Sequence, residues 1–433
     1  MRPPKTTLSF LRSSDATTDL KLIVRLAMAK KLRILLHYTH KQTLGHTTRT
    51  ISLATSIVDH HATKTSLLLL QGGALQPLIE HPKGYRLLNI PFPFDTRDSF
   101  RSRSIPQRTT ERAAFILKAA QEFTPGVFIT EFFPFGRSAY IPELLPALRY
   151  LRKTGCRIIA SIGYPLIIDL IRLQDRQFAA VYKALLSFYD AFLIHTPEQL
   201  ETPYFLRSIA SKEIADLYTA TLGSIRKKMI HTGYIFPRRI LTPTKNDGLE
   251  KLPPAPNTVI VSRGGGAVYP KLIVNAIQAQ KLLGKNFRMI IACGPSTSEK
   301  EMSLFKQVLK ENKGSPILLT SHLSDLDDHL RTCQVSISLC GYNTSVQLMR
   351  HGTPSVIVPY SNGLSRMPTN DQIARAALLQ EKFASTVLSY DTLTPRSLAQ
   401  AIRARADRPR PAPAPLSWFQ GARTSAKIIV EEA

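Results

Sequence analysis

The segment Gly341–Thr344 has the residue types of a phosphate-binding turn. It follows the apolar run Val335–Leu339 and precedes a helix-like stretch that ends at Gly352. Backbone N–H groups at a helix N-terminus carry partial positive charge and bind anions without a metal ion. The pattern therefore predicts that the amides around Gly341, Asn343 and Thr344 bind a diphosphate. Asn343 or Thr344 also fits the role of an ordinary helix N-cap.

A histidine that could transfer a proton lies in an earlier loop, after the predicted strand Leu32–His37. Gly45-His46 opens a helix predicted near 47–59, so both residues should lie at the carboxyl end of that strand. His46 could take a proton from an attacking hydroxyl or orient an acceptor or phosphate groups, and its alternative role is to cap the helix. We assign Gly45 and His40 to the same acceptor and phosphate loop, although a packing or loop hydrogen-bond role suits His40 better.

Three consecutive glycines follow another predicted strand, Thr258–Ser262. Glycine lets a backbone approach a ligand closely, so Gly264 and Gly265 are predicted to contact the ligand. A sharp turn without a ligand is the alternative. Arg263 beside them could offset the negative charge of a diphosphate.

Two other polar patterns do not predict metal sites. Asp325 and Asp327 have the spacing of a metal-binding pair, but they follow Ser324 at a predicted helix start, where acids complement the helix dipole. The run Asp59-His60-His61 resembles a phosphoesterase signature, yet it closes a predicted helix and lacks the aspartates of a two-metal site. We expect no metal ion.

The elements that position these residues alternate between short apolar strands and helices, which predicts an α/β fold with parallel sheets. In the first half, strands are predicted at Leu32–His37, Thr65–Leu70, Gly126–Thr130, Arg157–Ser161 and Ala191–His195, and helices near 47–59, 108–122, 141–153 and 174–188. In the second half, strands are predicted at Thr258–Ser262, Met289–Cys293, Ile317–Thr320 and Ser355–Pro359, and helices at Pro270–Leu283, Glu299–Asn312 and Ala422–Val430. A capping box at Ser298 and Glu301 supports one helix start.

Proline-rich stretches divide the chain into predicted parts. These are a flexible extension at 1–30, a Rossmann-like domain at 31–235, a linker at 236–256, a second Rossmann-like domain at 257–415 and a terminal helix at 416–433 that returns to the first domain.

Composition limits the functional classes. The length of 433 residues with 43% hydrophobic content suits two ordinary domains. The formal net charge of +26 favours an anionic partner, but Lys and Arg are spread along the whole chain, so no specific nucleic-acid binding is expected. The four cysteines lie in or beside apolar runs without CxxC spacing, which favours buried thiols. Without a spanning segment or signal peptide in the sequence, we expect a cytoplasmic protein.

The order of these motifs resembles the GT-B glycosyltransferases, in particular the MurG-like branch and the neighbouring bacterial predicted glycosyltransferase group. The resemblance runs from about Leu32 to the C-terminus. It rests on Tyr38–His40 with Leu44–Arg49, on Val261–Gly266, and on Gly341–Thr344 continuing through Gly352–Pro354 to Asp371-Gln372.

The resemblance implies two Rossmann-like domains that face each other across a cleft. It implies that Asp371 and Gln372 contact hydroxyls of a donor sugar, although a capping box with Thr369 as N-cap also fits. It further implies a carboxylate six positions after Gly341 that binds the donor ribose, where this chain has Gln347. The amide of Gln347 can still hydrogen-bond hydroxyls, but the donor is left open.

The resulting hypothesis is a metal-independent hexosyltransferase without a cofactor. It would move a sugar from a nucleotide diphosphate, with UDP favoured, to a hydroxyl acceptor that is a glycan, a lipid-linked glycan or a small molecule. The basic surface could associate peripherally with anionic lipid at the inner membrane face. The alternatives are a nucleotide-sugar 2-epimerase of the same fold and a non-catalytic protein that binds sugar nucleotides or polyanions.

Overall fold

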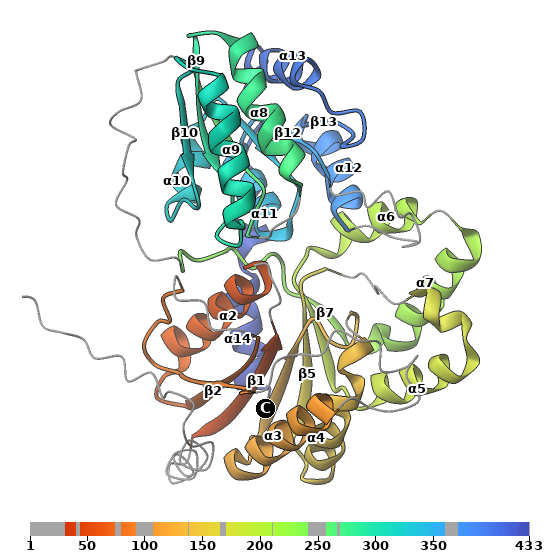
Figure 1. Cartoon of the computed structure of the whole chain (residues 1–433). Coiled ribbons are helices and arrows are strands. Elements are labelled where there is room, and N and C mark those ends of the chain that lie inside the picture. Colours follow the sequence, from red (N-terminus) through yellow and green to blue (C-terminus); the bar gives the residue numbers. More distant parts are fainter. Residues whose placement is uncertain are drawn as a thin grey trace, which may run out of the picture.

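The computed structural model describes residues 31–39, 44–73, 79–91, 107–136, 138–164, 170–209, 211–240, 257–265, 269–359 and 371–432. Figure 1 shows two α/β domains, one above the other, with the chain crossing between them. Outside the described residues lie His40, Gly266, Thr369, the predicted extension 1–30 and most of the predicted linker.

The first domain contains a parallel sheet with the strand order β3-β2-β1-β4-β5-β6-β7. Its strands are β1 (Leu32–Thr39), β2 (Thr65–Gly72), β3 (Arg86–Asn89), β4 (Val127–Glu131), β5 (Arg157–Ile162), β6 (Ala191–Ile194) and β7 (Met229–His231). The inner strands are continuous buried apolar runs, as a sheet covered on both faces requires. The sequence patterns predict these inner strands but miss β3 and β7, which are short, only partly buried and without a clear apolar run.

Helices cover both faces of this sheet. They are α2 (Gly45–His61), α3 (Gln107–Phe123), α4 (Ile141–Lys153), α5 (Arg176–Ser187), α6 (Glu198–Ser208) and α7 (Lys212–Ile225). The predicted helices α2 to α5 are confirmed, with ends that differ by at most two residues. Two helices were not predicted. They are α6, which carries Pro203 in its interior, and α7, which follows it closely.

The second domain repeats the plan with the order β10-β9-β8-β11-β12-β13. Its elements are β8 (Asn257–Ser262), α8 (Pro270–Leu283), β9 (Phe287–Ala292), α9 (Glu299–Glu311), β10 (Ile317–Thr320), α10 (Leu326–Thr332), β11 (Val335–Ser338), α11 (Tyr342–His351), β12 (Ser355–Ile357), α12 (Asp371–Phe383), β13 (Thr386–Val387) and α13 (Pro395–Ala406). The predicted bounds of α8 and β10 match the structure, and the capping box of Ser298 and Glu301 is present. The two-residue strand β13 and helix α13 were not predicted.

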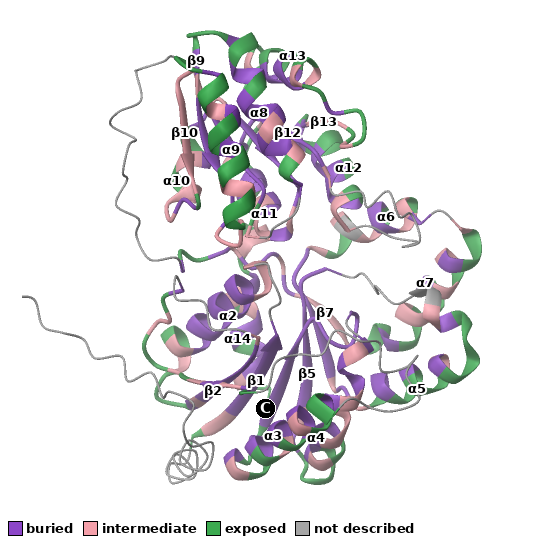
Figure 2. Ribbon diagram, viewed as in Figure 1, coloured by how far each residue is buried: buried purple, intermediate pink, exposed green. Residues whose placement is uncertain are grey.

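The strand order reverses between β1 and β4 in the first sheet and between β8 and β11 in the second. Such switch points open a crevice at the carboxyl ends of the strands, which is where doubly wound folds bind ligands. Figure 2 shows buried residues along the strands and exposed residues on the outer faces of the helices. Both domains therefore have their own covered core, and their crevices meet where the chain crosses.

The C-terminal helix α14 (Gly421–Glu431) packs against α2 of the first domain. Ala426 and Ile429 are fully buried in the cluster that contains Ile34 and Leu36 of β1. Burial of these apolar side chains fixes the end of the chain on the first sheet, after it has passed through the second domain.

Tyr342 connects the two domains. Its hydroxyl donates to the backbone oxygen of His195 over 2.8 Å and accepts from the backbone N–H of Ile235 over 3.0 Å. The guanidinium of Arg49 lies 5.0 Å from the centre of the tyrosine ring. Because Tyr342 begins α11, these contacts fix the start of that helix against the first domain.

The four cysteines are buried and free, in agreement with the predicted thiols. Within the described ranges, no helix combines the length and the apolar character needed to cross a membrane. Nor do the described residues contain a group of three or more His, Cys, Asp or Glu side chains that could hold a metal ion.

A buried histidine should make the stability of the first domain depend on pH. His195 hydrogen-bonds Ser161 over 2.8 Å through Nε2 and Thr232 over 2.9 Å through Nδ1, and burial lowers its pKa to about 3. Since the unfolded chain binds this proton near pH 6.5 and the folded protein does not, the free energy of unfolding should fall as pH drops below about 6.5. Protonation of this group in the unfolded chain should lower the free energy of unfolding by up to about 1.4 kcal/mol per pH unit.

Urea unfolding of the wild type and of His195→Gln at pH 7.5, 6.5 and 5.5 measures this contribution. The variant should be less stable at pH 7.5, but the difference from wild type should shrink at pH 5.5. His60→Gln, at an exposed position of α2, should keep the wild-type slope. Equal slopes for wild type and His195→Gln contradict the assignment.

Candidate functional site

A cavity of about 390 Å³ lies between the two domains, at the carboxyl ends of their strands. The structure brings together in its lining every predicted site residue that it describes. These are Gly45, His46, Arg263, Gly264, Gly265, Gly341, Asn343, Thr344, Gln347, Asp371 and Gln372. Residues from opposite halves of the chain thus share one concave site. Their distance along the sequence does not reveal this proximity.

The N-terminus of α11 opens into this cavity. Gly341 is its N-cap and provides no side-chain cap. Among the described residues, no acceptor pairs with the backbone N–H of Asn343 or Thr344, and the first turn contains no acidic residue. Two unpartnered amides at the positive end of a helix can bind an anionic group.

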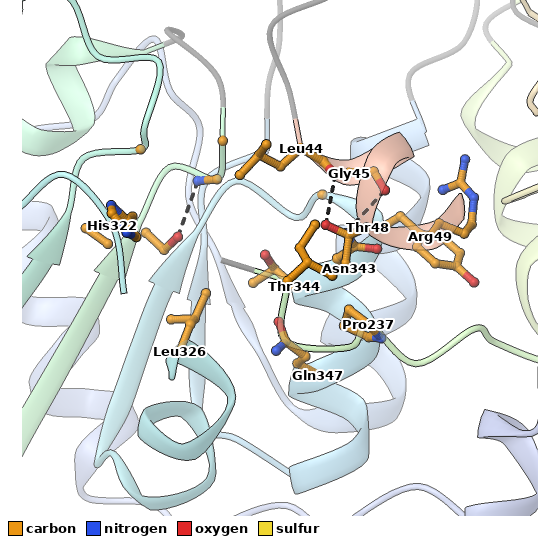
Figure 3. Close-up of a pocket in the computed structure, with 18 of the residues that line it drawn as sticks. Leu44, Gly45, Thr48, Arg49, Pro237, His322, Leu326, Asn343, Thr344 and Gln347 are labelled. Atoms are coloured by element: carbon orange, nitrogen blue, oxygen red, sulfur yellow. Dashed lines mark hydrogen bonds between the residues drawn. The ribbon is translucent and has the colours of Figure 1, made fainter. Parts of the chain in front are cut away.

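The alternative that Asn343 or Thr344 caps α11 is wrong, because the N-cap is Gly341. The side chain of Asn343 instead donates to the backbone oxygen of Gly45 over 3.3 Å, as Figure 3 shows. Its Oδ1 is buried without a partner within the described part of the chain. Asn343 therefore ties the start of α11 to the start of α2 across the cavity.

His46 lies in the first turn of α2, opposite α11, and its imidazole pairs with a buried carboxylate. Nδ1 is 2.9 Å and 3.0 Å from the two oxygens of Glu131, which is the last residue of β4. The side chain of His46 is 18% exposed, whereas that of Glu131 is 1% exposed. Arg49, one turn along α2, also donates to Glu131. His46 does not cap α2, whose N-cap is Leu44.

Two groups contact Nδ1 of His46. The carboxylate of Glu131 only accepts hydrogen bonds, whereas Nη2 of Arg49, 3.2 Å from Nδ1, only donates them. Because the contacts with Glu131 are shorter, we assign the proton to Nδ1, which donates it to Glu131. Nε2 is then the basic nitrogen of the ring. A histidine held in this way by a carboxylate can accept a proton from a hydroxyl and stabilise the charge that results.

Glu131 was missed in the sequence analysis, where the strand was predicted to end at Thr130. The signal that could have found Glu131 is its position at the carboxyl end of β4. This strand lies beside β1, and the loop with His46 follows the carboxyl end of β1. Polar residues at such strand ends deserve inclusion among candidate site residues.

The predicted glycine run makes a close contact between the domains. A Cβ added at Gly265 would lie 2.8 Å from the backbone nitrogen of Leu44. Gly294 has φ +96°, and a Cβ there would lie 2.5 Å from the oxygen of Gly264. Glycine at these positions is therefore explained by close packing of two turns and of the two domains. Contact of Gly264 or Gly265 with a ligand stays a prediction.

The prediction that Arg263 offsets a ligand's charge needs correction. Its side chain is fully buried, and its guanidinium nitrogens donate to Glu301 over 2.9 Å, to Thr297 over 2.8 Å and to the oxygen of Cys293. Glu301 balances the charge of Arg263 within the domain, and the same pairing lowers the pKa of that carboxyl. Arg263 supports the turn after β9 and the start of α9 rather than presenting charge to the cavity.

Asp371 begins α12 and pairs with Arg375 one turn later. Arg375 is almost fully buried, donates to the oxygen of Cys340 over 2.7 Å and lies 4.9 Å from the ring centre of Tyr164 in the first domain. One guanidinium thus connects the carboxylate of Asp371, the residue before Gly341 and the opposite wall of the cavity. This fixes the orientation in which Asp371 faces the cavity.

Comparison with known proteins identifies the second domain. The family model described as the glycosyltransferase family 28 C-terminal domain matches residues 259–417. The second domain is therefore similar to the C-terminal domain of glycosyltransferase family 28. The matched range contains the Gly341–Thr344 turn, Gln347 and Asp371-Gln372, and so includes the N-terminus of α11.

Curated relatives match a somewhat larger share of the chain than the family model does. Two are named UDP-N-acetylglucosamine--N-acetylmuramyl-(pentapeptide) pyrophosphoryl-undecaprenol N-acetylglucosamine transferase. The one from Thermoanaerobacter sp. (strain X514) is 25% identical over 186 residues, which cover 42% of this chain and 50% of the relative. The one from Clostridium tetani is 26% identical over 201 residues, which cover 46% of this chain and 51% of the relative. The chain thus spans about half the length of the curated relatives it matches.

Solved structures match over nearly the whole chain. MurG of Acinetobacter baumannii has a TM-score of 0.52 at 12% identity and covers 92% of this chain and 99% of its own. The glycotransferase of kitacinnamycin has a TM-score of 0.57 at 15% identity, with 92% and 96% covered. A putative UDP-N-acetylglucosamine 2-epimerase from Listeria monocytogenes has a TM-score of 0.55 at 11% identity, and the match covers 94% of this chain and 98% of the epimerase.

These comparisons confirm the predicted GT-B fold and the resemblance to the MurG-like branch. At such low identity the structural likeness shows the fold alone, and transferases and an epimerase share it. The family 28 domain, rather than the fold, is what points to glycosyl transfer.

In the second domain, Gln347 contacts Asp327, for which the sequence predicted only the role of a helix-start acid. Its Nε2 donates to Oδ1 of Asp327 over 3.0 Å, and Nε2 of His351 lies 2.9 Å from the same oxygen. Asp327 does lie in the first turn of α10, as predicted, but Asp325 makes no side-chain cap there. The explanation of Asp327 as a helix-start acid alone is therefore incomplete, because its side chain also lines the cavity.

Proposed function

We propose that this protein is a glycosyltransferase that moves a sugar from a nucleotide diphosphate to a hydroxyl group of an acceptor. One observation carries the proposal. A histidine paired with a buried carboxylate lies in the same cavity as the unpartnered amides that begin α11. A base on one wall and an anion site on the other are the two groups that glycosyl transfer from a diphosphate requires.

The proposed step uses both walls. Nε2 of His46 takes the proton of the acceptor hydroxyl while that oxygen forms a bond to the anomeric carbon of the sugar. The bond from this carbon to the diphosphate oxygen breaks, and its electron pair leaves with the diphosphate. The N–H groups of Asn343 and Thr344 stabilise the added negative charge. Glu131 keeps His46 oriented and balances the charge of the imidazolium.

The substrates of the relatives guide the choice of donor and acceptor. Their name specifies a UDP-sugar donor and a pyrophosphoryl-undecaprenol acceptor. We propose a UDP-sugar as donor and a lipid-linked or phosphorylated glycan as acceptor. We also propose that the protein associates peripherally with the inner membrane face. The formal net charge of +26 supports an anionic acceptor or surface.

Nucleotide release from a panel of UDP-, GDP- and dTDP-sugars, with and without lipid-linked and soluble glycan acceptors, tests the proposal. Release that depends on an acceptor supports glycosyl transfer. Epimerised donor would select the 2-epimerase, and binding without turnover across the whole panel would select a binding protein. Either of these results contradicts the proposed function.

Arg375 is expected to affect the sugar rather than the nucleotide. Arg375→Gln removes the charge that holds Asp371, which is proposed to contact sugar hydroxyls. Because a charge-assisted hydrogen bond contributes about 1.5–3 kcal/mol, the affinity for the nucleotide-sugar should fall about tenfold or more. Calorimetry should show a much smaller change for the free nucleoside diphosphate.

Lys382→Gln, at an exposed position of the same helix, is the matched control and should bind both ligands like wild type. Equal losses for nucleotide and nucleotide-sugar in Arg375→Gln would show that Arg375 acts only on the general architecture of the cavity.

A further inference from the structure

Tyr164 carries a hydroxyl that no residue in the described part of the chain binds. The residue lies just after β5, is only 7% exposed and lines the cavity. Its hydroxyl makes no hydrogen bond among the described residues, yet it is not sealed inside the protein as the unpartnered hydroxyl of Tyr234 is. The hydroxyl of Tyr164 is therefore open to the cavity. Because polar groups in such buried places are normally hydrogen-bonded, its partner is expected to be a ligand.

The ring of Tyr164 is held by contacts from both domains. Its centre lies 5.1 Å from the ring centre of Phe132 and 5.9 Å from that of Phe205, which stacks on it at an interplanar angle of 28°. The guanidinium of Arg375, from the second domain, lies 4.9 Å from the ring centre. Since these neighbours fix the ring, the hydroxyl has a defined place in the cavity.

That place is beside the proposed base, on the wall formed by the first domain. Phe132, which contacts Tyr164, also lies 5.3 Å from the ring of His46, centre to centre. Gly163, the residue before Tyr164, is so close to Arg49 that an added Cβ would lie 2.6 Å from the guanidinium carbon. Arg49 follows His46 by one turn of α2. The groups next to Tyr164 are thus also the groups next to His46.

The hydroxyl of Tyr164 keeps its proton in this setting. Burial raises its pKa, and the carboxylates of Asp371 and Glu131 add to that rise. The guanidiniums of Arg375 and Arg49 oppose it, and each is already paired with one of those carboxylates. A neutral tyrosine both donates and accepts hydrogen bonds, as the hydroxyl of a sugar does, so the two groups can pair in either direction.

We propose that the hydroxyl of Tyr164 binds a hydroxyl of the acceptor that neighbours the one deprotonated by His46, and so selects diols and sugars over monohydric alcohols. The inference rests on the proposed function, because it takes His46 as the base. The groups proposed to bind the donor, at the starts of α11 and α12, come from the second domain. Tyr164 comes from the first domain and lies beside the base, which places its hydroxyl against the acceptor.

Acceptor kinetics of Tyr164→Phe test the inference, because phenylalanine keeps the ring and removes the hydroxyl. With a soluble or lipid-linked glycan that supports nucleotide release, the acceptor KM should rise about three- to tenfold, which is the effect of one neutral hydrogen bond. The affinity for the nucleotide-sugar, measured by calorimetry without acceptor, should stay within about twofold of wild type. Tyr182→Phe removes a buried hydrogen bond to the oxygen of Pro134, outside the cavity lining, and is the matched control. It should keep the wild-type KM.

A set of small acceptors tests the selection without any variant. Cyclohexanol and the cis and trans vicinal cyclohexanediols share one ring and differ by one hydroxyl. In the wild type, kcat/KM for nucleotide release, divided by the number of hydroxyls, should be about three- to tenfold higher for the better diol than for cyclohexanol. In Tyr164→Phe the two values should agree within about twofold.

The outcomes keep the inference apart from the proposed function. An unchanged acceptor KM in Tyr164→Phe overturns the inference. A weaker affinity of this variant for the nucleotide-sugar also overturns it, since the hydroxyl would then bind the donor sugar. Equal values per hydroxyl for cyclohexanol and its diols in the wild type contradict it as well, and if none of these small acceptors supports release, the KM for the glycan decides alone.

Glycosyl transfer stands in each of those cases. Absence of nucleotide release with every acceptor overturns the proposed function, and the inference falls with it.

Discussion

Replacement of His46 by glutamine is expected to lower the rate of acceptor-dependent nucleotide release by about 10²–10⁴-fold, which is the usual contribution of a general base. Glutamine can still donate to Glu131, so the buried carboxylate keeps a partner. It has no basic nitrogen, however, and cannot take the proton of the acceptor hydroxyl. The affinity for the nucleoside diphosphate should stay within about threefold of wild type, because the amides of α11 are unchanged.

Steady-state release of nucleotide with a saturating acceptor measures the effect on turnover, and calorimetry measures the affinity. His60→Gln is the matched control, since His60 belongs to the same helix but is exposed and lies outside the cavity lining. It should turn over like wild type. A rate for His46→Gln within threefold of wild type would falsify the catalytic role of this residue.

The fold could be predicted because its signals are local. Each inner strand is a short apolar run, and each helix start or end carries its own residue, such as Pro270 before α8 or Gly284 after it. The elements that were missed lack these signals. Strand β3 is partly exposed, and α6 contains a proline, so their structure depends on neighbours that sequence periodicity does not reveal.

The positions of the site residues could be predicted better than their chemistry. Glycines and helix starts mark the loops at the carboxyl ends of strands, and the described loops do meet in one cavity. The partners of charged residues depend instead on tertiary contacts. Arg263 is paired with Glu301, which is 38 residues away, and His46 with Glu131, which is 85 residues away. No spacing rule in a single sequence connects such pairs.

Replacement of Glu131 by glutamine is expected to damage both turnover and stability. Glutamine offers one acceptor oxygen where the carboxylate serves both His46 and Arg49, and it leaves the guanidinium of Arg49 buried without a counter-charge. Removal of one partner of a buried ion pair costs about 3–5 kcal/mol. We expect a further fall of about 10–100-fold in the turnover of the folded protein, because the tautomer and orientation of His46 are no longer fixed.

A second buried ion pair in the same domain separates these two effects. Nε of Arg112 donates to Glu143 over 2.6 Å, both side chains are at most 1% exposed, and neither lines the cavity. Glu143→Gln should therefore lose a similar amount of stability in urea unfolding and keep the wild-type turnover at temperatures where it is folded. Equal turnover losses in the two variants would mean that Glu131 acts through stability alone. A loss of turnover confined to Glu131→Gln, with the KM for the donor unchanged, identifies Glu131 as the residue that positions the base.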